Sequence, residues 1–174
     1  MESKGRIFKI SLPVMKRFFI WMLTTFGLLG IYGCRPSMNI MYEEFVDVNP
    51  SGWNWDAGKS FTFEIADETH YYNLLSGLRI TSSYAYSNIW MLYTLKGPEG
   101  YFRKDQFQLV LSDNIGRWKG KGVSNLISYQ EPFLTQMPLK KGKYTLTIFQ
   151  NMRDENLESV NNLGLQVVRG QLIL

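Results

Sequence analysis

Hydrophobic residues gather first in one continuous block near the N-terminus. From Phe18 to Tyr32, fifteen positions are almost all apolar or small, which is short of the roughly 20 that cross a bilayer core. The basic pair Lys16–Arg17 precedes the block, and the small Gly33 and the only cysteine, Cys34, follow it. This order of basic, apolar and small residues is typical of a secretory signal peptide. The sequence therefore predicts a signal peptide over residues 1–33.

After Cys34 the pattern changes to alternation between apolar and polar residues. In residues 60–66, Phe61, Phe63 and Ile65 alternate with polar or small neighbours, which is the two-residue period of a strand with one buried face. Residues 89–95 are apolar at nearly every position and predict a central strand that is covered on both faces. Four more alternating runs are Leu74–Ile80, Phe107–Leu111, Tyr144–Ile148 and Leu163–Val167.

Turn-forming residues separate these runs, and no convincing amphipathic helix pattern follows Cys34. Seven to nine short strands punctuated in this way predict an all-β fold, an antiparallel β-sandwich of immunoglobulin-like or jelly-roll topology. We expect a single sandwich domain over residues 40–174, which is long enough for one sizeable core. The predicted turns are Asn49–Gly52, Lys96–Gly100, Asp113–Gly116 and Lys140–Gly142.

Removal of the signal peptide changes how the composition is interpreted. Five of the nineteen basic residues and one of the fifteen acidic residues precede Cys34, so fourteen of each remain. The mature chain is electrically balanced and gives no support to nucleic-acid binding. Met15 stands directly before the basic pair, and a start there gives a nineteen-residue signal of ordinary proportions. We therefore predict Met15 as the true start.

The residues Ile31–Cys34 resemble the bacterial lipobox, although Tyr32 departs from its preference for a small residue. The resemblance implies acylation of Cys34, and about two or three acyl chains make an anchor stable where one would be marginal. Residues 34–39 are polar and predict a short tether. No Asp follows Cys34 in Arg35–Ser37 to retain the protein in the inner membrane. We therefore expect an outer-membrane protein that faces the periplasm.

Side chains that could support catalysis are few. His70 is the only histidine and lies in a polar segment between two predicted strands, where a solvated loop residue is the favoured interpretation. The only thiol, that of Cys34, is taken up by acylation. Adjacent carboxylates such as Asp67–Glu68 point to opposite faces of a strand, so surface solubility explains them better than catalysis. We predict no catalytic residues, no metal site and no cofactor.

The segment Gly116–Gly122 is the most distinctive short run in the chain, and it lacks the ending of a phosphate-binding loop. In an extended conformation, Arg117, Lys119 and Lys121 share one face and Trp118 the other. A basic stripe of this kind suits an anionic partner. A lysine-protected edge strand is the plainer explanation, and we favour it.

Aromatic residues suggest a second candidate surface. Trp53 and Trp55 share a face of an extended segment and suit a sugar-binding platform or a protein interface, although core packing is the more common role. The loop Ser82–Asn88 is rich in Ser, Tyr and Asn, a mixture that suits contact surfaces. We take this loop as the best interface candidate, through Tyr84, Tyr86, Ser87 and Asn88.

Five groups of segments, taken in order, span nearly the whole mature chain behind the lipobox. They are Tyr42–Phe45, Tyr72–Leu74 with Leu78–Arg79, Tyr86–Trp90, Leu111–Asp113 with Gly116–Gly120, and Gln150–Asp154 with Leu157 and Gly164–Leu165. Together these segments resemble the gliding-motility lipoprotein GldH family of Bacteroidetes.

The resemblance implies a non-enzymatic outer-membrane lipoprotein that serves gliding and the type IX secretion apparatus as a scaffold or assembly component. Its partners would be the membrane, through Cys34, and proteins of that apparatus. The alternative is a carbohydrate-binding β-sandwich module, which the two tryptophans Trp53 and Trp55 suggest.

Overall fold

The structure is a computed structural model that describes residues 39–173. The predicted signal peptide, the predicted start at Met15, the predicted acylation site Cys34 and all but the last residue of the predicted tether lie outside these residues. Within residues 39–173, no helix is long and apolar enough to span a membrane.

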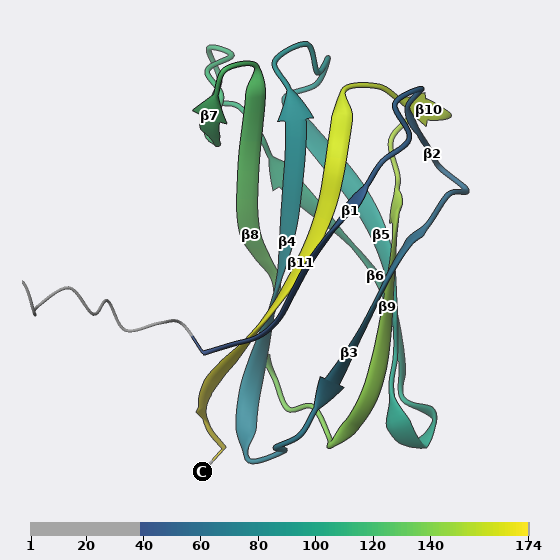
Figure 1. The fold of residues 1–174 in the computed structure, drawn as a ribbon, viewed down its shortest axis with the longest axis vertical. Coiled ribbons are helices and arrows are strands. Elements are labelled where there is room, and N and C mark those ends of the chain that lie inside the picture. The colour runs from purple at the N-terminus through teal and green to yellow at the C-terminus, as the bar shows by residue number, and fades with distance from the viewer. Residues whose placement is uncertain (1–38, 174) are drawn as a thin grey trace, which may run out of the picture. The chain divides into compact units, whose positions relative to one another are not determined.

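The described chain is built of antiparallel strands, which confirms the all-β prediction (Figure 1). Within residues 39–173, eight strands are long and three are short, and the single helical element is a turn of 3₁₀ helix, Pro98–Gly100. The long strands are β1 (Ile40–Asp47), β3 (Lys59–Ile65), β4 (His70–Thr81), β5 (Asn88–Lys96), β6 (Phe102–Val110), β8 (Leu126–Met137), β9 (Gly142–Gln150) and β11 (Val160–Leu172). The short strands are β2 (Trp53–Asn54), β7 (Lys121–Val123) and β10 (Asn156–Leu157).

The strand pairing is that of a long hairpin rolled onto itself. β5 pairs with β6 across residues 97–101, and the pairs β4–β8, β3–β9 and β1–β11 follow successively outward. Rolling adds the pairs β11–β4 and β9–β5. The result is a five-stranded sheet of order β1-β11-β4-β8-β7 and a four-stranded sheet of order β3-β9-β5-β6. This is a jelly roll, so the structure decides between the two predicted topologies.

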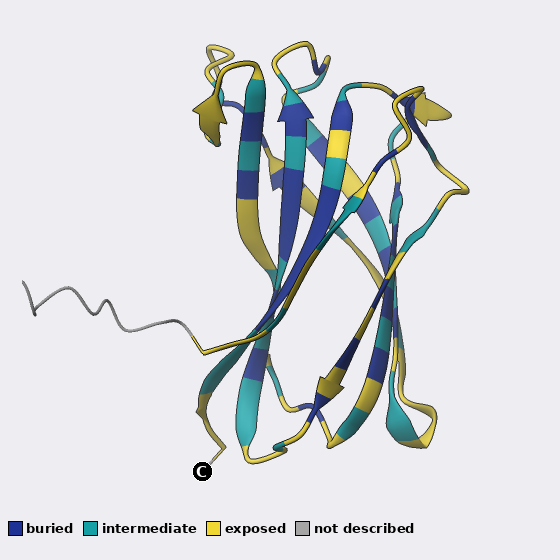
Figure 2. Cartoon of the chain, viewed as in Figure 1, coloured by how far each residue is buried: buried dark blue, intermediate teal, exposed yellow. Residues whose placement is uncertain are grey.

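The inner faces of both sheets meet in one hydrophobic core. Alternate residues of the strands are buried, as in β3, where Phe61, Phe63 and Ile65 point inward and their neighbours outward. Figure 2 shows this alternation as bands along the ribbons. The two-residue period therefore predicted the buried face of β3 correctly.

Two parts of the strand prediction need correction. β5 is an interior strand, as expected, but it is not covered on both faces, because Trp90 on its outer face is exposed. The strands β1 and β8 were not predicted. In β8, Pro132 cannot donate to the ladder, and the pairing with β4 shifts register between Leu134 and Pro132. A bulge of this kind breaks the alternation on which the prediction depends.

Candidate functional site

Tyr84, the first residue of the predicted contact loop, lies in the core. Its side chain is buried, and its hydroxyl donates to the carbonyl of Asn88 at 3.1 Å. Burial raises the pKa of the Tyr84 phenol, and the neighbouring Tyr86 and Asp154 add to the effect. This burial corrects the expectation that Tyr84 presents its side chain to a partner.

The other loop residues are held from two sides. Tyr86 is half-buried and donates from its hydroxyl to Asp154 at 2.6 Å. The carbonyl of Ser87 accepts from the amides of Leu111 and Ser112 at 2.8 and 3.1 Å. The loop is therefore tied to the ends of β6 and β9. The role of Tyr86, Ser87 and Asn88 in binding a partner stays a prediction.

The predicted basic stripe divides into two parts. Arg117 turns back to Asp113, with Nε at 2.8 Å from Oδ2, and closes the turn after β6. This hydrogen bond holds the pKa of Asp113 below its usual range. Trp118 packs partly against the core, as expected. Lys119 and Lys121 remain exposed and line a groove on the outer face of the five-stranded sheet.

This groove has a volume of about 380 Å³ and is named the basic groove. Its cations are Arg79 of β4, Lys119 of the segment before β7, and Lys121 of β7. Two acids, Glu43 and Glu131, also line it. Within residues 39–173, none of the three cations lies within 4 Å of a carboxylate oxygen. Among the described residues, the groove therefore has a formal excess of one positive charge, from three cations and two carboxylates.

A stacked pair forms one wall of the basic groove. The guanidinium of Arg79 lies over the ring of Phe45, 4.1 Å from its centroid. The ring in turn occupies the space above Gly77 and Gly164, where a Cβ atom would approach it within 2.5–2.7 Å. Stacking of this kind contributes about 0.5–1 kcal/mol at an exposed site and restricts the guanidinium to one side of the groove. Sequence reasoning missed Arg79 because the other cations lie about 40 positions away.

Trp53 and Trp55 do not form a common platform. Trp53 is 1 % exposed and donates from Nε1 to the carbonyl of Ala57 at 2.9 Å, whereas Trp55 is 44 % exposed. Trp55 lines a second groove of about 360 Å³ on the outer face of the four-stranded sheet, with apolar Leu92 and Phe149. We call it the tryptophan groove. Only one of the two predicted tryptophans is available to a ligand.

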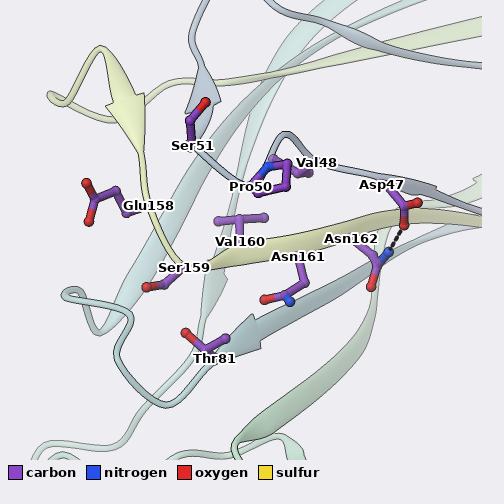
Figure 3. A pocket seen from close by; sticks show the side chains of 10 residues that line it. All are labelled: Asp47, Val48, Pro50, Ser51, Thr81, Glu158, Ser159, Val160, Asn161 and Asn162. Atoms are coloured by element: carbon purple, nitrogen blue, oxygen red, sulfur yellow. Dashed lines mark hydrogen bonds between the residues drawn. The ribbon is translucent and has the colours of Figure 1, made fainter.

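A hollow of about 750 Å³ lies where β1 ends and β11 begins (Figure 3). We call it the polar cavity, because hydroxyl, amide and carboxylate groups dominate its lining. The amide of Asn162 donates to Asp47 at 2.5 Å. Its other polar side chains are Ser51, Thr81, Glu158, Ser159 and Asn161. Nothing in the sequence pattern indicated this site, since its residues come from three separate segments.

His70 is the first residue of β4 and is half-buried, which corrects its predicted place in a solvated loop. Its Nδ1 lies 2.8 Å from Oδ2 of Asp67 and 3.1 Å from the hydroxyl of Thr69. Hydrogen bonds from Thr69 and, less strongly, from His70 lower the pKa of Asp67. In the described part of the chain, no group of three or more His, Cys, Asp and Glu residues is placed to hold a metal ion.

Comparisons with known proteins connect this sandwich to one family. Residues 40–167 match the model of the GldH lipoprotein family. The gliding motility lipoprotein GldH of Flavobacterium johnsoniae is 25 % identical over 134 residues, which are 73 % of this chain and 83 % of that protein. The GldH homolog of Christiangramia forsetii is 24 % identical over 135 residues, 73 % of this chain and 82 % of that protein.

Solved structures give weaker similarities. A CBM28 carbohydrate-binding module specific for non-crystalline cellulose has a TM-score of 0.42 and 8 % identity, covering 74 % of this chain and 73 % of that one. The VP2 subviral particle of infectious bursal disease virus has a TM-score of 0.32 and 12 % identity, covering 74 % and 33 %. These scores are too low to bear on function. The family match spans the jelly roll from β1 into β11, and this chain belongs to the GldH lipoprotein family.

Proposed function

We propose that this chain is a lipid-anchored outer-membrane component of the gliding and type IX secretion machinery, and that it acts there as a non-enzymatic scaffold. The observation that carries the proposal is the family match over residues 40–167, behind the lipobox at Cys34. Of the two relatives described above, one is named gliding motility lipoprotein GldH and the other is named as a homolog of that lipoprotein. Acylation of Cys34 would hold the jelly roll on the periplasmic side of the outer membrane.

The basic groove is the surface through which we expect the scaffold to bind a protein. Arg79, Lys119 and Lys121 give the groove its positive charge, and the guanidinium of Arg79 lies over the ring of Phe45. Charged groups at an interface favour association when they meet the opposite charge on a partner. An acidic segment of a neighbouring envelope protein therefore suits this groove, with Glu43 and Glu131 restricting its register.

The test is crosslinking in intact cells, followed by identification of the captured proteins. The wild-type chain should capture motility or secretion proteins, and the double variant Lys119→Glu/Lys121→Glu should lose them. Lys143→Glu, which changes an exposed lysine on β9 of the other sheet, is the matched control and should retain them. Recovery of only lipid and murein by the wild-type chain would contradict the scaffold proposal.

Localisation and acylation need a separate test. The wild-type protein should incorporate labelled palmitate and fractionate with the outer membrane, and Cys34→Ala should do neither. Palmitate incorporation by the Cys34→Ala variant would contradict the proposed anchor. A deletion strain should lose gliding or secreted proteins. Restoration by the wild-type gene but not by the Cys34→Ala gene would show that the function requires the anchor.

The tryptophan groove supports a second candidate function, carbohydrate binding. Trp55 is exposed beside the polar side chains of Asp56 and Asn151, and an aromatic face with nearby polar groups suits a sugar ring. Trp55→Ala should abolish retention on a glycan array, whereas Trp90→Ala, an exposed tryptophan outside the groove, should not. If the wild-type chain binds no glycan, or Trp55→Ala binds as well as the wild type, this candidate fails.

A further inference from the structure

Four exposed apolar side chains lie along one edge of the five-stranded sheet. Ile40 and Met41 begin β1, and Leu172 and Ile173 lie at the end of β11. Leu172 is 58 % exposed. We call these four residues the apolar edge. Figure 1 shows the start of β1 and the end of β11 on the same side of the sandwich.

Strand pairing places the start of β1 beside Val168 of β11, four positions before Leu172. Ile40 pairs with Val168, and the amide of Arg169 donates to the carbonyl of Asn39 at 2.9 Å. Leu172 follows Val168 by four positions along β11, about 13 Å at the rise of a strand. Among the described residues, no residue of β1 pairs with β11 after Val168. The end of β11 is therefore an open edge.

The length of chain before β1 identifies what can cover this edge. Cys34 and Ile40 are six positions apart, so the covalent chain separates them by at most about 20 Å whatever its path. An acylated Cys34 would therefore keep Ile40 within that distance of the membrane. In a sandwich that stands upright on the membrane, the far end lies beyond this reach, because the eleven steps of β4 from His70 to Thr81 add about 36 Å.

We propose that the apolar edge inserts into the interface of the membrane that carries the acyl anchor. This inference rests on the proposed acylation of Cys34. The anchor alone would leave the sandwich free to rotate on its tether. A second contact fixes its orientation, with the loops after β4 and before β8 directed away from the lipid. The apolar edge therefore contacts the lipid surface, and not a second protein.

The experiment uses the full acylated protein in vesicles of phosphatidylethanolamine and phosphatidylglycerol. Since acylation consumes the only natural thiol, a new cysteine can carry an environment-sensitive fluorophore. Leu172→Cys places the fluorophore on the apolar edge, and Val123→Cys is the matched control. Val123 is 79 % exposed and pairs with Leu126, opposite Thr81 at the far end of β4.

The fluorophore at position 172 should shift its emission to shorter wavelength and be quenched several-fold more by nitroxide-labelled lipids than the fluorophore at 123. The double substitution Ile40→Asp/Met41→Asp should remove most of this difference while the protein still floats with the vesicles. Equal quenching at 172 and 123 in a floating protein would overturn the inference. A wild-type protein that does not float would instead count against the anchor in the proposed function.

Discussion

Trp53 and Trp55 stand two positions apart in the chain and have opposite environments. Trp53 is covered on all sides and its indole nitrogen has a partner in Ala57. The carbonyl of Trp53 also lies 3.3 Å from the side-chain amide of Gln150, a buried residue at the end of β9. Trp53 therefore holds the short strand β2 against the core, while Trp55 is free for a ligand.

This contrast predicts different effects on stability. Trp53→Ala should lower the free energy of unfolding by about 3–5 kcal/mol, since it empties a buried site. Trp55→Ala should lower it by less than about 1 kcal/mol, because a partly exposed ring loses little contact. Urea denaturation followed by circular dichroism measures both values. Similar losses for the two variants would contradict the assignment of Trp53 to the core.

The turn that Asp113 and Arg117 close predicts a dependence on pH. The pKa of Asp113 is lowered in the folded chain, first by the Arg117 side chain and then by its backbone amide. A carboxyl with a depressed pKa contributes stability above its ordinary pKa, about 3.9, and that contribution disappears as the pH falls through the lower folded value. Between pH 6 and pH 3, the urea concentration at the midpoint of unfolding should fall further for the wild type than for Asp113→Asn. Equal losses would show that the turn does not depend on this charge.

At the scale of elements, glycines set how closely strands and side chains approach on the five-stranded sheet. Gly77 of β4 and Gly164 of β11 are direct partners, and Phe45 of β1 is the partner of Gly164. The absence of two side chains leaves a depression that the Phe45 ring fills. The position of Arg79, and so the shape of the basic groove, depends on this packing.

Gly164→Ala should therefore displace the Phe45 ring and cost about 1–3 kcal/mol of stability. In the double variant Gly164→Ala/Phe45→Ala, the loss should be smaller than the sum of the single losses, because the clash is gone. Gly122→Ala is the control, since its nearest neighbour would be 4.0 Å away. Additive losses in urea denaturation would contradict the proposed contact.

At the scale of the whole molecule, the rolled hairpin makes the first and last long strands neighbours. β11 lies between β1 and β4, and its residues Leu163, Leu165 and Val167 are fully or almost fully buried. One core joins both sheets. Loss of β11 would open that core along its length and leave the two strands unpaired on one side.

A chain that ends at Ser159 should therefore show no cooperative urea transition and no near-ultraviolet circular dichroism. A chain that ends at Gly170 is the control and should keep both, because residues 171–173 are exposed. Cooperative unfolding of the shorter chain would show that the other strands form a core without β11.

The family resemblance, the β class and the inward face of the most regular strands followed from the sequence by itself. The reason is local: a strand repeats every two residues, so apolar positions such as Phe61, Phe63 and Ile65 indicate the buried side without knowledge of the partner strand. Turn residues with special backbone demands, such as Gly142 at φ 141°, are equally local. The exposure of Lys119 and Lys121 was also predicted correctly.

Only the tertiary structure decided which strands pair and which side chains meet. Tyr84 lies in a loop outside the two-residue period, so its burial depends on the path of the chain around it. Arg79 joins Lys119 and Lys121 only because β4, β8 and β7 are neighbours in one sheet. The pairing of β1 with β11, which brings Ile40 beside Val168, is set by the rolled hairpin. Pairings between distant segments depend on closing the whole core, which no local pattern records.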